Sequence, residues 1–282
     1  MQLLNLLLTL MTIVVWIAVF YPKTNLLTLR VLDIGQGDSL LLTLPEGQTI
    51  LIDGGPDHTV IEKLGTYLPF WEHSLDVFVL THPHEDHLSG ALDVLNTYTV
   101  EGIISNPAKD EQTASWKAWN IKLATTKHMS IQEIASIHTE DHRVTLDLFS
   151  GSEVQKNQNN NSIVLGITFG EVRMTLMGDA EVELEKELLQ TTSFFNSPIT
   201  VLKTGHHGSQ TSSSTAFLEV LHPQIGLISC GINNKFNHPY PETVERLKKL
   251  GTALYRTDLQ GTIEVMTDGN IVEVATEKEL PI

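Results

Sequence analysis

Three histidines and an aspartate crowd into six positions of the chain, in the stretch THPHEDHLSG that begins at Thr81. They are His82, His84, Asp86 and His87, and they follow the apolar run DVFVL, which is typical of a buried strand. Residues two apart at the end of a strand project to the same side, so His82 and His84 can reach one metal ion. Asp86 and His87 lie where the chain turns into a helix and can reach a second ion nearby. Imidazole and carboxylate ligands without thiolate suit zinc, manganese or iron, so this stretch predicts a metal site.

Short apolar runs alternate with helical patterns on both sides of this stretch. LLTLRVLDI, DSLLLTL and QTILIDGG predict three strands before DVFVL, and RVTLDLF, NSIVLGITF and VRMTLMG predict three more after it. The last third of the chain has the same alternation, and it predicts further strands at ITVLK, IGLISC, ALYRT, TIEVM and IVEVA. Helices are expected at 60–68, 86–95, 115–124, 181–190 and 215–221 and in PETVERLKKL, which has proline at its start. Two strand-rich halves with helices attached predict two sheets packed face to face with helices outside, an α/β (α+β) fold.

The charge and cysteine content exclude some classes of protein. The net charge of -16 argues against a broad electrostatic surface for nucleic acid. Cys230 is the only cysteine, so no internal disulfide can form. Its place in the apolar run GLISCG predicts a buried strand residue and not a nucleophile.

The first residues differ from the rest of the chain. The stretch from Leu3 to Tyr21 carries no charge, and at helical rise it would span roughly 30 Å, the thickness of a hydrocarbon core. A cleaved signal peptide is the alternative, but residues 18–20, Ala-Val-Phe, make a poor cleavage site. We therefore predict an uncleaved single-pass transmembrane helix at 1–22 and a hydrolase domain at 23–282. The domain is expected on the extracytoplasmic side, although only Lys23 and Arg30 bear on the orientation.

The cluster His82-x-His84-x-Asp86-His87 after a strand resembles the signature of the metallo-β-lactamase superfamily, whose αββα sandwich matches the layout above. Further motifs occur in order over about residues 28–268: VLDIGQGDSLLL, ILIDGG, NNSIVL, LMGDA, LKTGHHGS, SCGINNKFNHPYPETVERL and YRTDLQGTIEV. Together they resemble the carboxy-terminal domain of the ComEC family, the DNA-uptake channel proteins of bacterial competence. The resemblance implies a role in competence and DNA uptake.

The resemblance also implies roles for residues outside the first cluster. Asp179, in MTLMGDA, would bridge two ions, and His238, in FNHPYPET, would be the last ligand of the second ion. His206 and His207, in GHHGS, would face the substrate, although one of the pair is expected to point away. Without the resemblance, Asp179 would be a helix cap and His238 a turn residue. The expected metal ligands are His82, His84, Asp86, His87, Asp179 and His238, and the expected catalytic residues are Asp86, Asp179, His206 and His207.

Four further residues are expected near the ions. The superfamily's middle histidine ligand, expected before NSIVL, is replaced by Asn160 or Asn161, which would make the first site loose. Asp38 and Asp53 lie in loops at strand ends and are expected to orient ligands and water, with a purely structural role as the alternative.

The expected chemistry is hydrolysis with up to two divalent ions, zinc or manganese. Two ions roughly 3.5–4 Å apart lower the pKa of a shared water and clamp the attacking and leaving oxygens. With Asp86 or Asp179 steering the water, this suits a phosphodiesterase or nuclease, and the resemblance implies DNA as the substrate. The net negative charge of the chain argues against DNA as the substrate, so Lys203 would have to attract the phosphate groups locally. Two alternatives stay open: a small-substrate metallohydrolase acting on a phosphoester or lactone, and a non-catalytic metal-binding module in DNA uptake.

Overall fold

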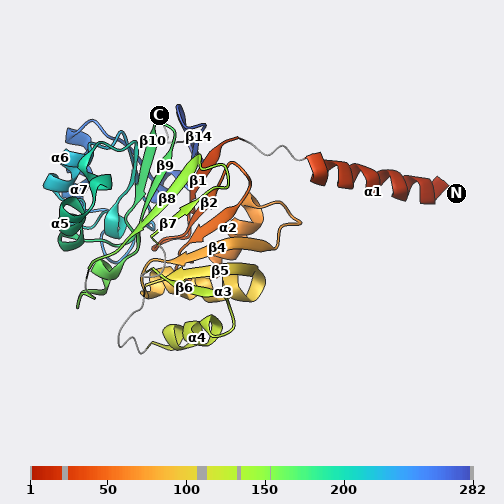
Figure 1. Ribbon diagram of the computed structural model, residues 1–282, viewed down its shortest axis with the longest axis horizontal. Coiled ribbons are helices and arrows are strands. Elements are labelled where there is room, and N and C mark those ends of the chain that lie inside the picture. The colour runs from red at the N-terminus through yellow and green to blue at the C-terminus, as the bar shows by residue number, and fades with distance from the viewer. Residues whose placement is uncertain (1, 21–24, 107–112, 132–134, 153, 280–282) are drawn as a thin grey trace.

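The chain folds into two β-sheets packed face to face with helices on both outer faces (Figure 1). The computed structural model describes residues 2–20, 25–106, 113–131, 135–152 and 154–279. Within these residues the first sheet has eight strands, in the spatial order β15 (Val272–Thr276), β14 (Ile263–Thr267), β1 (Leu27–Val31), β2 (Leu40–Thr43), β3 (Thr49–Ile52), β4 (Ser74–Leu80), β5 (Thr99–Ser105) and β6 (His128–Ser130). The second sheet has seven, in the order β13 (Ala253–Arg256), β12 (Ile225–Ile228), β11 (Val201–Lys203), β10 (Val172–Leu176), β9 (Val164–Phe169), β8 (Val144–Phe149) and β7 (Ser136–His138).

The apolar pattern of the strands explains this two-sheet arrangement. In β1, Leu27, Leu29 and Val31 point into the core between the sheets, while Thr28 and Arg30 point to the outer face. The central strands β3 and β4 run parallel and are buried on both faces, since helices cover their outer side. The helices on this side are α2 (Thr59–Tyr67), α3 (Glu85–Thr97) and α4 (Ala114–Leu123). Those on the second sheet are α5 (Val182–Thr191), α6 (Thr215–Leu221) and α7 (Pro241–Lys249). The αββα sandwich is therefore confirmed.

Most of the predicted elements are present, and three strands were missed. β5 has the sequence TVEGIIS, in which Glu101 and Gly102 interrupt the apolar run, and β6 and β7 are only three residues long. The burial expected for Cys230 is confirmed, but this residue lies two positions after the end of β12 (Ile225–Ile228) and not in a strand. Its Sγ lies 3.3 Å from Asp258 Oδ1, and burial together with this carboxylate raises the pKa of the thiol to about 12. This thiol is therefore protonated at neutral pH and is a poor nucleophile.

The N-terminal helix α1 (Gln2–Phe20) forms, but the prediction of a transmembrane anchor at Leu3 to Tyr21 is wrong. In the part of the chain that the structure describes, no helix combines the length and the apolar character needed to cross a membrane. The predicted single-pass localisation, with the domain on the extracytoplasmic side, is therefore contradicted. The predicted boundary at residues 22 and 23 lies outside the described residues.

Close backbone packing fixes helix α3 against the loop that follows β3. Gly54 N donates to His87 O at 2.7 Å, and Gly90 N donates to Gly55 O at 3.0 Å. A Cβ on Gly90 would lie 2.1 Å from Gly54 O, a distance that real Cβ atoms essentially never show. The same helix carries Asp86 and His87, so this contact also sets the position of the candidate metal ligands.

Gly90→Ala is expected to lower the free energy of unfolding by about 1–3 kcal/mol, because the added methyl pushes α3 away from the loop. It should also weaken metal binding through Asp86 and His87. Gly65→Ala is the matched control, since nothing lies within 4 Å of a Cβ at that position in α2. It should be neutral or stabilise by up to about 1 kcal/mol. Urea unfolding measures both, and equal midpoints for the two variants would contradict the packing argument.

Candidate metal centre

The candidate residues come from strands of both sheets and meet at one end of the sandwich. Asp53 follows β3 and His82 follows β4, which is parallel to β3. Asp179 follows β10 and His207 follows β11, and these two strands are also parallel. Because the carboxyl ends of parallel strands lie at the same end of a sheet, each sheet brings its pair to one place.

Asp179 lies at the centre of a buried cluster of histidines. Its carboxylate oxygens lie 3.6 Å from His82 Nε2, 3.4 Å from His87 Nε2 and 3.6 Å from His207 Nε2. Asp86 completes the cluster, with Oδ2 3.5 Å from His207 Nε2. Among the described residues, four sets of three ligand atoms lie within 4.8 Å of one another, and two of these sets include Asp38. The other two form the ligand sets of this cluster, with His82, His87 and Asp179 in one and Asp86, His87 and His207 in the other.

The unpaired atoms of this cluster fit a divalent cation. His82 Nε2, His87 Nε2, His207 Nε2 and Asp179 Oδ1 are all buried, and none has a hydrogen-bond partner among the described residues. Buried polar atoms normally find such partners, so four orphaned atoms facing one another call for another explanation. Ring nitrogens and carboxylate oxygens are ligands for zinc and manganese. The cluster therefore has the donor set of a metal centre.

Asp53 holds His87 in one orientation, as the sequence predicted. Its Oδ2 lies 2.7 Å from His87 Nδ1, and it also accepts from Thr81 N at 2.8 Å and Thr81 Oγ1 at 2.7 Å. With Nδ1 engaged by Asp53, Nε2 of His87 is the atom that faces the cluster. Burial is the largest influence on Asp53 and raises the pKa of its carboxyl group.

Asp38 and Lys203 form a fully buried ion pair beneath His207. Lys203 Nζ donates to Asp38 Oδ2, and Asp38 Oδ1 lies 3.3 Å from His207 Nδ1. The same His207 nitrogen lies 3.0 Å from Ser229 O, so His207 is held from two sides. Burial opposes ionisation of Asp38, but Lys203 and His207 outweigh it and lower the pKa of this carboxyl group to about 2. Lys203 is thus an internal residue, and it cannot gather substrate phosphate as the sequence suggested.

His206 differs from its neighbour in exposure and in partner. Both residues lie in the 3-10 turn η3 (Gly205–Gly208) with left-handed backbone angles, φ 46° at His206 and 52° at His207. Such angles are costly for residues other than glycine and cluster at functional sites. The His206 side chain is 24% exposed, against 1% for His207. His206 Nδ1 lies 3.0 Å from Glu181 Oε1, and its Nε2 lies 3.8 Å from Asp179.

His84 and His238 lie beside the cluster and belong to neither of its two ligand sets. The His84 ring is 4.6 Å from the His82 ring, and the His238 ring is 5.1 Å from the His206 ring, measured between centroids. Burial, with His207 and His206 nearby, lowers the pKa of His238 to about 4, so this ring is neutral at pH 7.

The two asparagines expected as a weak ligand turn away from the cluster. They lie in the 3-10 turn η1 (Gln158–Asn161), where a loop was expected. Asn160 Oδ1 accepts from Glu181 N at 2.9 Å, and Asn161 Oδ1 accepts from Gln155 N at 2.7 Å. Ser162 lies closer to the ligands, with Oγ 3.5 Å from His82 Nδ1. Neither amide oxygen is therefore directed at the metal centre.

Carboxylates around the cluster raise the pKa of two of its histidines, His207 and His87, whereas burial lowers the pKa of His82 well below its usual value. Burial lowers the pKa of His207, but Asp179 and Asp38 outweigh burial and raise this pKa to about 9. Burial also lowers the pKa of His87, but Asp179 and Asp53 outweigh burial and raise this pKa well above its usual value. Burial opposes ionisation of Asp179, and the positive charges of His207 and His87 hold its pKa well below the usual value.

The metal-free protein is therefore expected to lose stability as pH rises. His207 releases its proton near pH 6.5 when unfolded and near pH 9 when folded. A pKa that is raised on folding adds stability that is complete below the unfolded value and disappears as pH rises through the folded value. Urea unfolding in EDTA at pH 6, 7.5 and 9 measures this loss. His207→Asn should reduce the pH dependence, and a metal-free parent that becomes more stable toward pH 9 would contradict the assignment.

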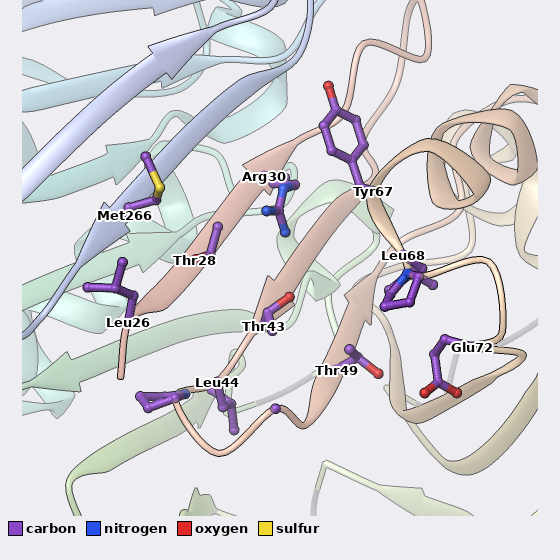
Figure 2. A pocket seen from close by; sticks show the side chains of 13 residues that line it. Leu26, Thr28, Arg30, Thr43, Leu44, Thr49, Tyr67, Leu68, Glu72 and Met266 are labelled. Carbon is purple, nitrogen blue, oxygen red and sulfur yellow. The ribbon is translucent and has the colours of Figure 1, made fainter. Parts of the chain in front are cut away.

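A separate pocket of about 290 Å³ lies on the outer face of the first sheet (Figure 2). Side chains of β1, β2 and β3 and of the end of α2 line it, among them Arg30, Thr43 and Tyr67. None of the clustered histidines or carboxylates borders this pocket. The buried histidines and carboxylates that face one another lie in the cluster, so we assign the functional site to the cluster and not to the pocket.

The two-sheet sandwich and the histidine–aspartate cluster at its end together define a metal-dependent hydrolase fold of the αββα type. The sequence model of the Metallo-beta-lactamase superfamily matches residues 32–232, more than half of the chain, so the chain belongs to this superfamily. Solved structures with the same fold include YhfI from Bacillus subtilis, with TM-score 0.56, 14% identity and coverage of 88% of this chain and 99% of that one. Igni18, a metallo hydrolase from Ignicoccus hospitalis, has TM-score 0.54 and 13% identity, covering 84% of this chain and 98% of that one.

The curated relatives include proteins of the ComEC family, among them competence protein ComA of Neisseria gonorrhoeae, which confirms the resemblance to this family. ComE operon protein 3 of Bacillus subtilis is 28% identical over 256 residues, 83% of this chain and 32% of that protein. Recombination protein 2 of Haemophilus influenzae is 27% identical over 239 residues, 83% of this chain and 28% of that protein. The chain thus spans about a third of the length of these relatives.

Sequence reasoning missed Glu181 as a site residue. The Glu181 carboxylate accepts hydrogen bonds from Asn159 Nδ2 and from Asn157 Nδ2, each at 2.8 Å, and it also contacts His206. Its place two residues after Asp179 was the available signal, because the chain there passes the same end of the sandwich. Lys203 was noticed, but nothing in the sequence indicated that Asp38, far away in the chain, would pair with it.

Proposed function

We propose that the chain is a metal-dependent phosphodiesterase that cuts DNA. The observation that supports this most is the buried cluster around Asp179, in which two sets of three ligand atoms share His87. Neighbouring cation positions suit displacement at phosphorus, where charge develops on both the attacking and the leaving oxygen. The relation to competence proteins supports DNA as the phosphodiester.

The geometry supports a specific assignment of ligands. We assign His82, His87, Asp86, Asp179 and His207 as the residues that would hold the metal, with His84 close enough to join His82. His207 takes the position expected for His238, because it is buried in the cluster while His238 stands outside both ligand sets. When bound, the metal lowers the pKa of a water and polarises the phosphoryl oxygens.

The chain's own residues supply orientation and proton transfer. The Asp179 carboxylate stays ionised at the centre of the cluster, where it can orient the attacking water. His206 is the more exposed histidine of its pair, and Glu181 engages Nδ1, which leaves Nε2 to face the substrate. In its protonated form, with Nδ1–H on Glu181, His206 would donate a hydrogen bond from Nε2 to the phosphate or to the departing oxygen.

Metal analysis followed by an assay on the full chain tests this proposal. The protein is stripped with EDTA, reloaded with Mn²⁺ or Zn²⁺ and dialysed, and its metal content is measured. Single-stranded DNA, duplex DNA and bis(p-nitrophenyl) phosphate are then offered as substrates. We expect up to two ions per chain and cleavage of a DNA strand. Metal content near zero would overturn the proposal. Bound metal without hydrolysis of any phosphodiester would favour the non-catalytic module.

A small-substrate hydrolase is the second candidate, and the net charge of -16 favours it. The negative potential of the protein repels a long polyanion along its whole length, whereas a small ester meets this potential only at the site. Efficient turnover of a small phosphoester or lactone, with DNA left intact across 20 to 200 mM salt, would establish this second function.

A further inference from the structure

The loop at residues 231–240, between β12 and α7, is held in shape by one asparagine side chain. Asn234 Nδ2 donates to Gly231 O at 2.9 Å and to His238 O at 2.6 Å. Asn234 Oδ1 accepts from Phe236 N at 3.2 Å and from His238 N at 3.0 Å. Four bonds from one side chain fix this loop, so what it presents to solvent is preorganised.

The loop presents an aromatic ring that is covered on one side only. Phe236 is 44% exposed, and its ring stacks on His238 with centroids 5.8 Å apart and an interplanar angle of 23°. Lys235 lies next to the ring, with Nζ 5.0 Å from the ring centroid. Both side chains are exposed, and the flexible lysine can move away from the ring without disturbing the loop.

His238 connects this ring to the metal centre. Its ring centroid lies 5.1 Å from that of His206 and 6.1 Å from that of His207. Its Nδ1 is buried and has no hydrogen-bond partner among the described residues. The exposed aromatic face of Phe236 is therefore linked to the cluster through two adjoining rings, His238 and His206.

We propose that Phe236 and Lys235 form a base-stacking subsite for single-stranded DNA beside the metal centre. A nucleobase stacks on the open face of Phe236, while Lys235 turns from the ring to a backbone phosphate. Base stacking on an aromatic ring tolerates any sequence and requires an unpaired strand. The subsite also explains how an acidic protein retains a polyanion, because stacking does not depend on net charge. This inference rests on the proposed function, whose substrate class it makes specific.

Binding measurements on the full chain test the subsite without requiring hydrolysis. A fluorescein-labelled oligothymidylate and a matched strand with abasic sites replacing the bases are titrated by fluorescence anisotropy. The titrations are done in EDTA, so that no strand is cut, and repeated with Mn²⁺ on phosphorothioate strands. Phe236→Ala should raise the Kd for the normal strand roughly 5- to 100-fold, the range expected for loss of one stacked base. The abasic strand should bind the parent and Phe236→Ala equally, and Phe236→Tyr should bind both strands like the parent.

Three outcomes would overturn the subsite. They are a parent that does not distinguish the two strands, a Phe236→Ala variant that binds the normal strand like the parent, and equal weakening on both strands. The last would mean that the ring only supports the loop, and unfolding of each variant in urea would show this as lost stability. A parent that binds single strands in this way but hydrolyses none of them would refute the proposed nuclease and leave the stacking subsite standing.

Discussion

Asp179→Asn is expected to lower phosphodiester hydrolysis by well over 100-fold and to reduce metal content. The variant keeps the shape of the side chain and removes the charge that faces His82, His87 and His207 at 3.4–3.6 Å. No other carboxylate among the described residues contacts all three of these rings. Initial rates at saturating metal, together with metal content after dialysis, measure the two effects.

Asp53→Asn and Asp268→Asn are the matched controls for Asp179→Asn. Asp53 acts on the metal through His87, and loss of such an orienting partner typically costs about 10–100-fold. Asp268 is exposed in a turn between β14 and β15, so its replacement tests the loss of one negative charge alone and should leave activity unchanged. Hydrolysis that survives Asp179→Asn at the level of Asp53→Asn would refute Asp179 as the central ligand.

Lys203→Met is expected to lower the free energy of unfolding by about 3–5 kcal/mol, because it leaves the buried Asp38 carboxylate without its charged partner. Lys203 and Asp38 are both fully buried, so water cannot replace the lost bond. The double variant Lys203→Met, Asp38→Asn should recover part of this loss, since it removes the uncompensated charge as well. Urea unfolding of the parent, the single variant and the double variant at pH 7 gives the three values. A single variant within 1 kcal/mol of the parent would show that the pair contributes little.

The first ligand cluster was predictable because its residues are close together in the sequence. His82, Asp86 and His87 follow one strand and begin one helix, so a short stretch determines their mutual positions. Asp179 was found because a buried strand directly precedes it. The two sheets were predictable for a similar reason, since alternating and continuous apolar runs mark strands without any knowledge of their partners.

The partners of the histidines required the three-dimensional structure. Whether His207 or His238 joins the cluster depends on the left-handed turn at 206–208 and on Asn234, and no local pattern determines how these two loops face each other. The pairing of Lys203 with Asp38 links residues 165 positions apart. The strand β14 pairs with β1 at the opposite end of the sequence, which no periodicity indicates.

The division of the ligands between the two sheets has a consequence for the synthesis of the protein. His82, Asp86 and His87 lie in the first half of the chain, and Asp179 and His207 lie in the second. The first half leaves the ribosome early with an incomplete set of ligands, and only later residues complete it. Under the proposed ligand assignment, a product truncated before Asp179 would lack ligands for the ion and would not gain the stabilisation that a bound ion gives to the folded state.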